Sequence, residues 1–201
     1  MLTKALFLLP FAAFALAAAK APPPAPAEPV MPSIAAPADV AANPANTLRL
    51  QLSNGGTVVI QLRPDIAPQH VARIQTLVRQ GFYNGLTFHR VIPGFMAQGG
   101  DPKGTGEGGS SLPDLKAEFT QMPFLRGTVA AARLGDNENS ANSQFFIMFG
   151  PNGGMTGQYS IFGRVLSGMD AVNKIAPGEP PPEPTKIVKA YLGDTAAVAA
   201  K

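Results

Sequence analysis

The 201-residue chain contains no cysteine and only two histidines, His70 and His89. The absence of cysteine excludes disulfides, thiol nucleophiles and thiolate metal sites, and two histidines alone cannot form a histidine-rich zinc site. Charged residues make up only 14% of the sequence, and its 16 lysines and arginines are scattered without a basic run. Proteins that bind a nucleic-acid backbone concentrate their positive charge, so we expect neither a metal nor a nucleic-acid partner.

The length allows one core of ordinary size and is too short for two. Glycine and proline are abundant, with 21 of each, but the prolines crowd into residues 22–44 and 177–184. This uneven placement indicates linkers and loops, since a collagen-like chain would repeat regularly. No repeat of the length found in solenoids or propellers is present, and a single folded domain is predicted.

The N-terminus has the pattern of a secretory signal peptide. Lys4 precedes an apolar run over residues 5–16, which ends in three alanines, and this charged, apolar and small-residue order is typical of such leaders. We predict removal of residues 1–19, with a cut after Ala21 as a less favoured alternative. A buried helix or uncleaved anchor is the other interpretation, but the run contains Pro10 and is shorter than the about 20 residues that span a bilayer.

Residues 20–46 are almost entirely alanine, proline, valine and small polar residues, a composition that favours a disordered linker. We therefore place the folded domain at residues 47–192 and a flexible tail at 193–201. The signal peptide predicts a periplasmic protein without stable membrane insertion after cleavage; secretion or N-terminal membrane anchoring are the alternatives.

The pattern from residue 47 onward is that of a β-rich domain. Alternating leucines over 47–53, an Asn-Gly-Gly turn and a β-branched run over 57–62 predict a hairpin. A helix is predicted over 68–80, between Pro68 and Gly81. Further strands are predicted at 86–92, 95–98, 128–132, 145–149, 161–165 and 185–192, and a short helix at 168–176. Many short strands with one or two helices favour a closed antiparallel barrel.

Two segments are the most informative: FHRVIPGFMAQGGD at 88–101 and NSQFFI at 142–147. Together they resemble the two signature segments of cyclophilins, and the resemblance extends from Thr47 to Leu192. It implies a mainly β fold, a closed eight-stranded antiparallel barrel capped by two α-helices, with a peptide groove on its outside. It also implies a monomeric peptidyl-prolyl cis/trans isomerase that acts on proline-containing polypeptides and needs no cofactor.

Arg90 is the predicted catalytic residue. Rotation about an X-Pro bond needs no nucleophile, acid or base, because a fixed donor to the proline nitrogen is enough to stabilise the twisted amide. The arginine guanidinium is permanently charged and carries its donors in a rigid fork. The alternative is an ordinary surface arginine paired with an acid.

The resemblance also assigns the substrate-binding residues. Four apolar residues would line the proline pocket, with Tyr159 at its rim: Phe95, Met96, Phe146 and Met155. Four further residues would position the peptide: Gln98, Gln144 and the backbone of Ala132 and Arg133. Gln98 would also orient Arg90. Strand alternation predicts that Phe145 and Phe146 point to opposite sides, one to the core and one to the pocket.

The sequence departs from well-known eukaryotic cyclophilins in having no tryptophan at the pocket edge, where the loop ends in Met155, so we expect weak cyclosporin binding. Tyr159 replaces a histidine, and its ring and hydroxyl should preserve activity. His89 is interpreted as a buried, hydrogen-bonded structural residue and not as a proton shuttle.

Two shorter motifs receive structural interpretations. Residues 104–109 match G-x-G-x-x-G, but the segment after them cannot open a phosphate-binding helix, so a flexible loop near the groove is predicted. Residues 136–140 resemble a calcium loop but lack its glycine and terminal glutamate, and a solvated turn is predicted.

The sequence leaves two other functions to compare with isomerisation. A prolyl-peptide binding module or holdase would use the same groove without turnover. A barrel hydrolase is disfavoured, because the sequence offers no cysteine, no G-x-S-x-G elbow and no plausible histidine dyad.

Overall fold

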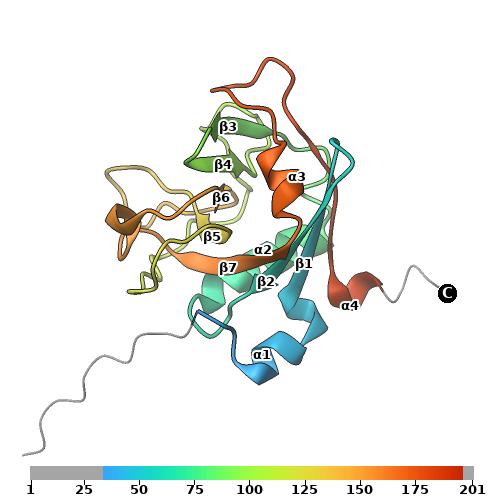
Figure 1. Cartoon of the computed structure of the whole chain (residues 1–201). Coiled ribbons are helices and arrows are strands. Elements are labelled where there is room, and N and C mark those ends of the chain that lie inside the picture. Colours follow the sequence, from blue (N-terminus) through green and yellow to red (C-terminus); the bar gives the residue numbers. More distant parts are fainter. Residues whose placement is uncertain (1–33, 197–201) are drawn as a thin grey trace, which may run out of the picture. The chain divides into compact units, whose positions relative to one another are not determined.

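The computed structural model describes residues 34–196 (Figure 1). The predicted signal peptide, residues 20–33 of the predicted linker and residues 197–201 lie outside this range. Within it, no helix has the length and apolar character needed to cross a bilayer.

One antiparallel sheet of eight strands forms the body of the domain, in the order β3-β4-β6-β5-β7-β2-β1-β8. The strands are β1 (Thr47–Leu52), β2 (Thr57–Leu62), β3 (Phe88–Ile92), β4 (Met96–Gly99), β5 (Thr128–Ala131), β6 (Phe145–Met148), β7 (Ile161–Ser167) and β8 (Ile187–Leu192). The predicted mainly β fold with eight antiparallel strands is therefore confirmed.

The predicted hairpin is formed by β1 and β2. Leu48 lies opposite Ile60 and Leu50 opposite Val58, which places the apolar residues of both strands on the buried face. The side chain of Asn54 accepts a hydrogen bond from the Gly56 N–H at 3.1 Å, so this turn is stabilised by local contacts.

The sheet curls into a half-barrel, and the predicted closure is only partial (Figure 1). Its edge strands β3 and β8 meet at one end, where Thr87 bridges Lys186 and the Phe88 N–H donates to the Thr185 carbonyl at 2.9 Å. Farther along β3, Val91 pairs instead with Gly178. The proline-rich loop (residues 177–184) therefore covers the part of the β3 edge that a closed barrel would pair with β8.

Two helices match the predicted ones. Helix α2 (Pro68–Arg79) begins at a proline and buries Val71, Ile74, Leu77 and Val78, and it packs against β8 and β7. Helix α3 (Met169–Asn173) is shorter than predicted and packs against β2.

The ordered domain starts before the predicted boundary at residue 47. Helix α1 (Ala38–Ala42) and the 3-10 helix η1 (Pro44–Asn46) occupy the end of the predicted linker. Val40 and Asn46 are buried, and Gln61 donates from Nε2 to the Asn46 carbonyl at 3.2 Å. These tertiary contacts order a segment whose composition alone predicts disorder.

The predicted flexible tail also begins with structure. Helix α4 (Gly193–Ala196) follows β8 directly, and its Asp194 pairs with Arg79 of α2 at 2.7 Å.

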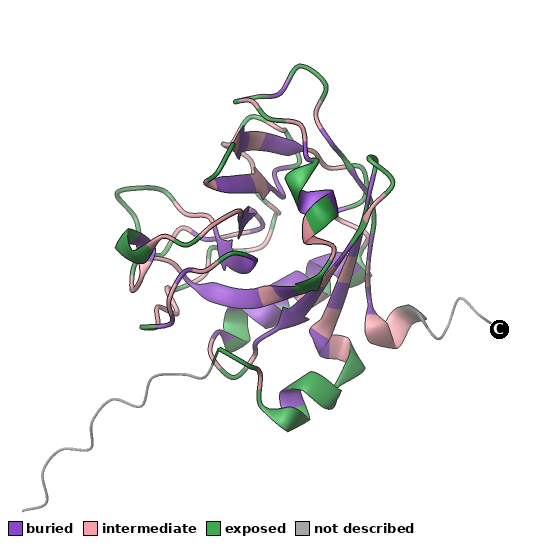
Figure 2. Cartoon of the chain, viewed as in Figure 1, coloured by how far each residue is buried: buried purple, intermediate pink, exposed green. Residues whose placement is uncertain are grey.

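Most residues of the sheet strands are buried (Figure 2). Alternate residues of β6 belong to two different apolar clusters, here called inner and outer, which therefore lie on opposite faces of the sheet. The inner cluster includes Phe145, whose ring meets those of Tyr83 and Phe88 edge-on. The outer cluster includes Phe146 and Met155. The predicted alternation of Phe145 and Phe146 is confirmed, and the outer cluster forms the base of the candidate site.

Candidate active site

A cavity of about 220 Å³ opens on the outer cluster, and nine of the ten predicted site residues line it. They are Arg90, Phe95, Met96, Gln98, Ala132, Arg133, Phe146, Met155 and Tyr159. The tenth, Gln144, lies next to them in an adjoining cavity of about 320 Å³, which shares Gln98, Ala132 and Arg133. The sequence-predicted residues are thus brought together, although their roles stay predictions.

The register of three strands sets the polar and apolar sides of this site. Arg90 of β3 lies opposite Gln98 of β4, and Gln98 lies opposite Phe146 of β6. Residues directly opposite on neighbouring strands share a face of the sheet. A guanidinium, an amide and an aromatic ring therefore stand in one row on the outer face.

Aromatic packing fixes the apolar wall. The ring of Phe146 lies parallel to that of Phe124, with centroids 6.2 Å apart, and meets the ring of Tyr159 edge-on at 5.5 Å. Met155 reaches the wall from the short helix η2 (Gly153–Met155), which the Asn152 side chain caps by accepting from the Gly154 N–H at 3.1 Å. The loop without tryptophan therefore still supplies a buried apolar side chain to the cavity.

The guanidinium of Arg90 has two neighbours. Its Nε donates to Glu179 Oε2 at 2.6 Å, and its Nη1 has a longer contact of 3.5 Å with Gln98 Oε1. The Arg90 side chain is 42% exposed. It is thus held from two sides and still open to the cavity.

Gln98 also begins a hydrogen-bond relay to a neighbouring loop. Its Nε2 donates to Gln144 Oε1 at 2.9 Å, and Gln144 Nε2 donates to the carbonyls of Gly106 and Gly108, both at 2.8 Å. The segment that matched G-x-G-x-x-G thus lies beside the site and contacts it through Gln144.

Asp101 shapes the same loop from inside. Its carboxylate accepts hydrogen bonds from the backbone N–H groups of Lys103, Thr105 and Gly106, at 2.8, 2.9 and 2.6 Å. Burial alone would raise the pKa of Asp101, but these backbone donors outweigh it and hold the pKa below its ordinary value. A loop predicted only as flexible is thus wrapped around a buried carboxylate.

Gly100 allows β4 to leave the sheet next to the second signature segment. Its φ is +89°, and a Cβ there would lie 2.5 Å from the Ser143 carbonyl oxygen. The Ser143 hydroxyl in turn donates to the Gly100 carbonyl at 2.8 Å. Only glycine combines this left-handed backbone with so close an approach.

Arg133 contributes its side chain as well as its backbone. Its Nε donates to the Gln158 carbonyl at 3.0 Å and its Nη1 to the Leu134 carbonyl at 2.8 Å. Its guanidinium carbon lies 4.9 Å from the centre of the Tyr159 ring, a cation–π geometry. The sequence predicted a role only for the backbone here, and no local pattern indicated that the side chain would cover Tyr159.

His89 is buried, as predicted, but the predicted hydrogen bonding is wrong for the part of the chain that the structure describes. Neither ring nitrogen has a protein partner there, and only 4% of the residue is exposed. Burial lowers its pKa; Asp101 partly opposes this shift, and Arg90 adds to it. His89 is therefore neutral near pH 7.

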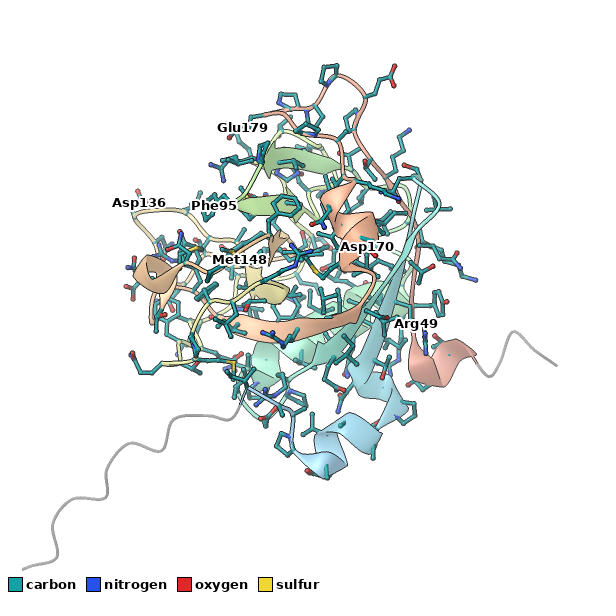
Figure 3. The ribbon with its side chains drawn as sticks, viewed as in Figure 1. Arg49, Phe95, Asp136, Met148, Asp170 and Glu179 are labelled. Carbon is teal, nitrogen blue, oxygen red and sulfur yellow. The ribbon has the colours of Figure 1, made fainter. Side chains whose placement is uncertain are left out.

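Glu179 is the site residue that sequence reasoning missed. It belongs to the proline-rich loop, labelled near the top of Figure 3, and its carboxylate contacts Arg90 of β3. The only sequence signal was an acidic residue within a proline-rich segment. The described residues 34–196 contain no cluster of three or more histidine, aspartate or glutamate side chains that could hold a metal ion.

The family model for cyclophilin type peptidyl-prolyl cis-trans isomerase/CLD matches residues 47–192. A probable peptidyl-prolyl cis-trans isomerase of Brucella suis biovar 1 is 54% identical over 168 residues, which cover 76% of this chain and 85% of the relative. Peptidyl-prolyl cis-trans isomerase B of Bacillus subtilis is 38% identical over 128 residues, covering 64% and 89%.

Solved structures agree with the family model. A cyclophilin from Hirschia baltica has a TM-score of 0.68 at 32% identity, covering 75% of this chain and 74% of that one. A Cryptosporidium parvum cyclophilin, crystallised in the presence of the dipeptide Ala-Pro, has a TM-score of 0.67 at 26% identity, covering 73% and 98%. The chain therefore belongs to the cyclophilin family and is a peptidyl-prolyl cis-trans isomerase.

Proposed function

We propose that this isomerase works without a covalent intermediate and that the Arg90 guanidinium stabilises the twisted amide. An X-Pro bond prefers trans by only about 0.5–1 kcal/mol, whereas amide resonance sets a barrier of about 18–20 kcal/mol. During rotation the lone pair localises on the proline nitrogen. A donor held against that nitrogen stabilises the transition state more than either planar form, and the rate rises.

The observation that carries this proposal is the position of Arg90 in the lining of a cavity to which Phe146 and Met155 contribute apolar walls. A proline ring packed on these side chains would bring its nitrogen toward the guanidinium. Apolar walls lower the local dielectric and so strengthen a charged hydrogen bond. Because this hydrogen bond stabilises the twisted amide without proton transfer, the proposed catalysis needs neither an acid nor a base.

The polar residues would hold the peptide around the proline. Gln98 would position the substrate carbonyl and orient Arg90, and Gln144 would contact the peptide beside it. The Ala132 N–H is already engaged by the Gln144 carbonyl at 3.0 Å. Backbone contacts to the residue before proline would therefore come from the Ala132 carbonyl and from Arg133.

We further propose that the enzyme is exported to the periplasm, where it assists the folding of exported proteins as a monomer. The proposed export rests on the N-terminal order of Lys4, an apolar run and three alanines, and the monomeric state on the resemblance to cyclophilins. Secretion and N-terminal anchoring remain alternatives, which fractionation of cells that express the full chain would distinguish. We also expect weak cyclosporin binding, because the chain has no tryptophan.

The test of the mechanism is the cis-to-trans exchange rate of an Ala-Pro peptide, measured by NMR exchange spectroscopy with the purified protein and with Arg90→Ala. Loss of one transition-state donor reduces turnover by about 10²–10³-fold, so the variant should lose nearly all acceleration while still binding the peptide. Full activity of Arg90→Ala would overturn the mechanism. Peptide binding without acceleration by the unsubstituted protein would instead indicate a binding module.

A further inference from the structure

We propose that the proline-rich loop (residues 177–184) orients the catalytic guanidinium, with Glu179 as a positioning residue for Arg90. This inference rests on the proposed catalytic role of Arg90. It gives a function to a segment whose composition otherwise indicates only a connection between α3 and β8.

Two backbone hydrogen bonds attach the loop to β3 next to Arg90. The Val91 N–H donates to the Gly178 carbonyl at 2.8 Å, and the Gly178 N–H donates to the Val91 carbonyl at 3.0 Å. Arg90 precedes Val91 and Glu179 follows Gly178 in the sequence. The pairing therefore brings the Glu179 carboxylate to the Arg90 side chain, where Oε2 accepts from Nε at 2.6 Å.

The composition of the loop suits a fixed carboxylate. Proline restricts φ and so reduces the conformational entropy lost when a loop is held in one shape. Gly178 has a φ of +141°, and a Cβ there would lie 2.7 Å from the Cα of Pro181, which is itself buried. The loop is thus folded closely on itself around Gly178, and Glu179 lies in a segment whose backbone has little conformational freedom.

The contact with Glu179 leaves the other end of the guanidinium for the substrate. Glu179 engages Nε, Gln98 lies near Nη1, and Nη2 of Arg90 has no hydrogen-bond partner among residues 34–196. With one edge held, the planar group keeps its orientation, and its free donors can point toward the cavity. Such pre-organisation acts on the transition state, because a donor that must first be ordered loses part of its effect.

Orientation, and not stability, is the role that the exposure of the pair supports. The Arg90 and Glu179 side chains are 42% and 51% exposed, and ion pairs in such positions contribute little to folding. Removal of Glu179 should therefore change turnover while the fold and the melting temperature stay nearly the same.

A different role for Glu179 on the same geometry, the binding of a basic substrate side chain, would give a different kinetic result. A cavity of about 640 Å³ on this side of Arg90 is lined in part by His89, Thr105, Glu179 and Pro180. If the carboxylate bound a basic substrate side chain there, its loss would raise KM for basic peptides. Under our proposal its loss lowers kcat for a neutral peptide.

The experiment measures kcat and KM for a neutral Ala-Pro peptide with the unsubstituted protein, Glu179→Ala, Glu179→Gln and the control Glu183→Ala. Glu183 is exposed in the same loop and makes no hydrogen bond or ion pair with the described residues. We expect Glu179→Ala to lower kcat about fivefold, equivalent to about 1 kcal/mol, with KM changed less than twofold. Glu179→Gln keeps a neutral acceptor at the same reach and should retain at least half of kcat, and Glu183→Ala all of it.

An NMR measurement of the Arg90 Nε–H resonance accompanies the kinetics. It should be sharp in the unsubstituted protein and in Glu183→Ala, and broadened by exchange in Glu179→Ala. Unchanged kcat in Glu179→Ala, an effect on KM alone, or an equal loss in Glu183→Ala would each overturn the proposal. Because the unsubstituted protein is measured in parallel, its failure to accelerate exchange would count against the mechanism proposed for Arg90 and not against Glu179 alone.

Discussion

Gln98 and Gln144 are joined by a hydrogen bond of 2.9 Å from Nε2 of the first to Oε1 of the second. Since Gln98 also faces Arg90 and Gln144 holds the carbonyls of Gly106 and Gly108, this bond links the guanidinium to the glycine-rich loop. The two signature segments of the sequence are thus connected at their polar side chains.

We expect Gln144→Ala to lower kcat/KM about three- to tenfold, because Gln98 loses the partner that fixes its amide and the loop loses two hydrogen bonds. Each such bond contributes about 0.5–1.5 kcal/mol. The measurement is Ala-Pro exchange by NMR, with Gln69→Ala as the control, since Gln69 is exposed on α2. Equal kcat/KM values for Gln144→Ala and the control would show that the relay has no catalytic role.

Local sequence patterns were enough to predict the strands and the main helix. Alternating leucines and a turn identified β1 and β2, and the run from Pro68 to Gly81 identified α2 within one residue at its end. The candidate site was predictable for a related reason, because most of its residues lie in two short contiguous segments.

Contacts between distant residues were not predictable in the same way. Arg90 and Glu179 are 89 positions apart, and nothing in the composition of either segment indicates the other. The ordering of α1 depends on Gln61, which lies 21 residues beyond Val40. Partial closure of the barrel likewise follows from the pairing of Val91 with Gly178, which composition alone cannot reveal.

The start of the folded domain provides a stability test. We expect a chain that begins at Thr47 to be about 2–4 kcal/mol less stable than one that begins at Ile34. The shorter chain loses a buried valine, worth about 1.5–3 kcal/mol, and the hydrogen bonds from Gln61 and Gln75 to the carbonyls of Asn46 and Ala45. Urea unfolding of both chains measures the difference, and coincident midpoints would mean that α1 and η1 add nothing to the domain.

The two buried histidines predict a pH dependence of stability. Burial lowers the pKa of His89 and of His70 from the ordinary value of 6.5, although Asp101 and Glu118 partly oppose the shift. A lowered pKa means that the unfolded chain binds protons first as the pH falls. The free energy of unfolding should therefore decrease below about pH 6.5, by at most about 1.4 kcal/mol per pH unit for each histidine.

Chemical denaturation between pH 7.5 and 5 measures this slope. His89→Gln removes one of the two titrating histidines and should reduce the slope. Arg90 and Arg73, whose positive charges help to lower the pKa values of His89 and His70, are unchanged in this variant. Asp65 and Asp101, whose pKa values are lowered, add stability that is lost only in more acidic solution, as the pH falls below about 4. An identical slope in the variant would show that His89 does not titrate differently on folding.

The most direct test of the Arg90 mechanism is to compare Arg90→Lys with Arg90→Ala in Ala-Pro exchange, with the melting temperature of each variant as the control for folding. Lysine keeps the positive charge and has three donors, but all three lie on one nitrogen at the end of a flexible chain and cannot reproduce the rigid fork of the guanidinium. We predict that both variants stay folded and that Arg90→Lys loses at least tenfold in kcat, approaching Arg90→Ala. Activity of Arg90→Lys equal to that of the unsubstituted protein would contradict a role for the guanidinium geometry, and full activity of Arg90→Ala would contradict any catalytic role for this residue.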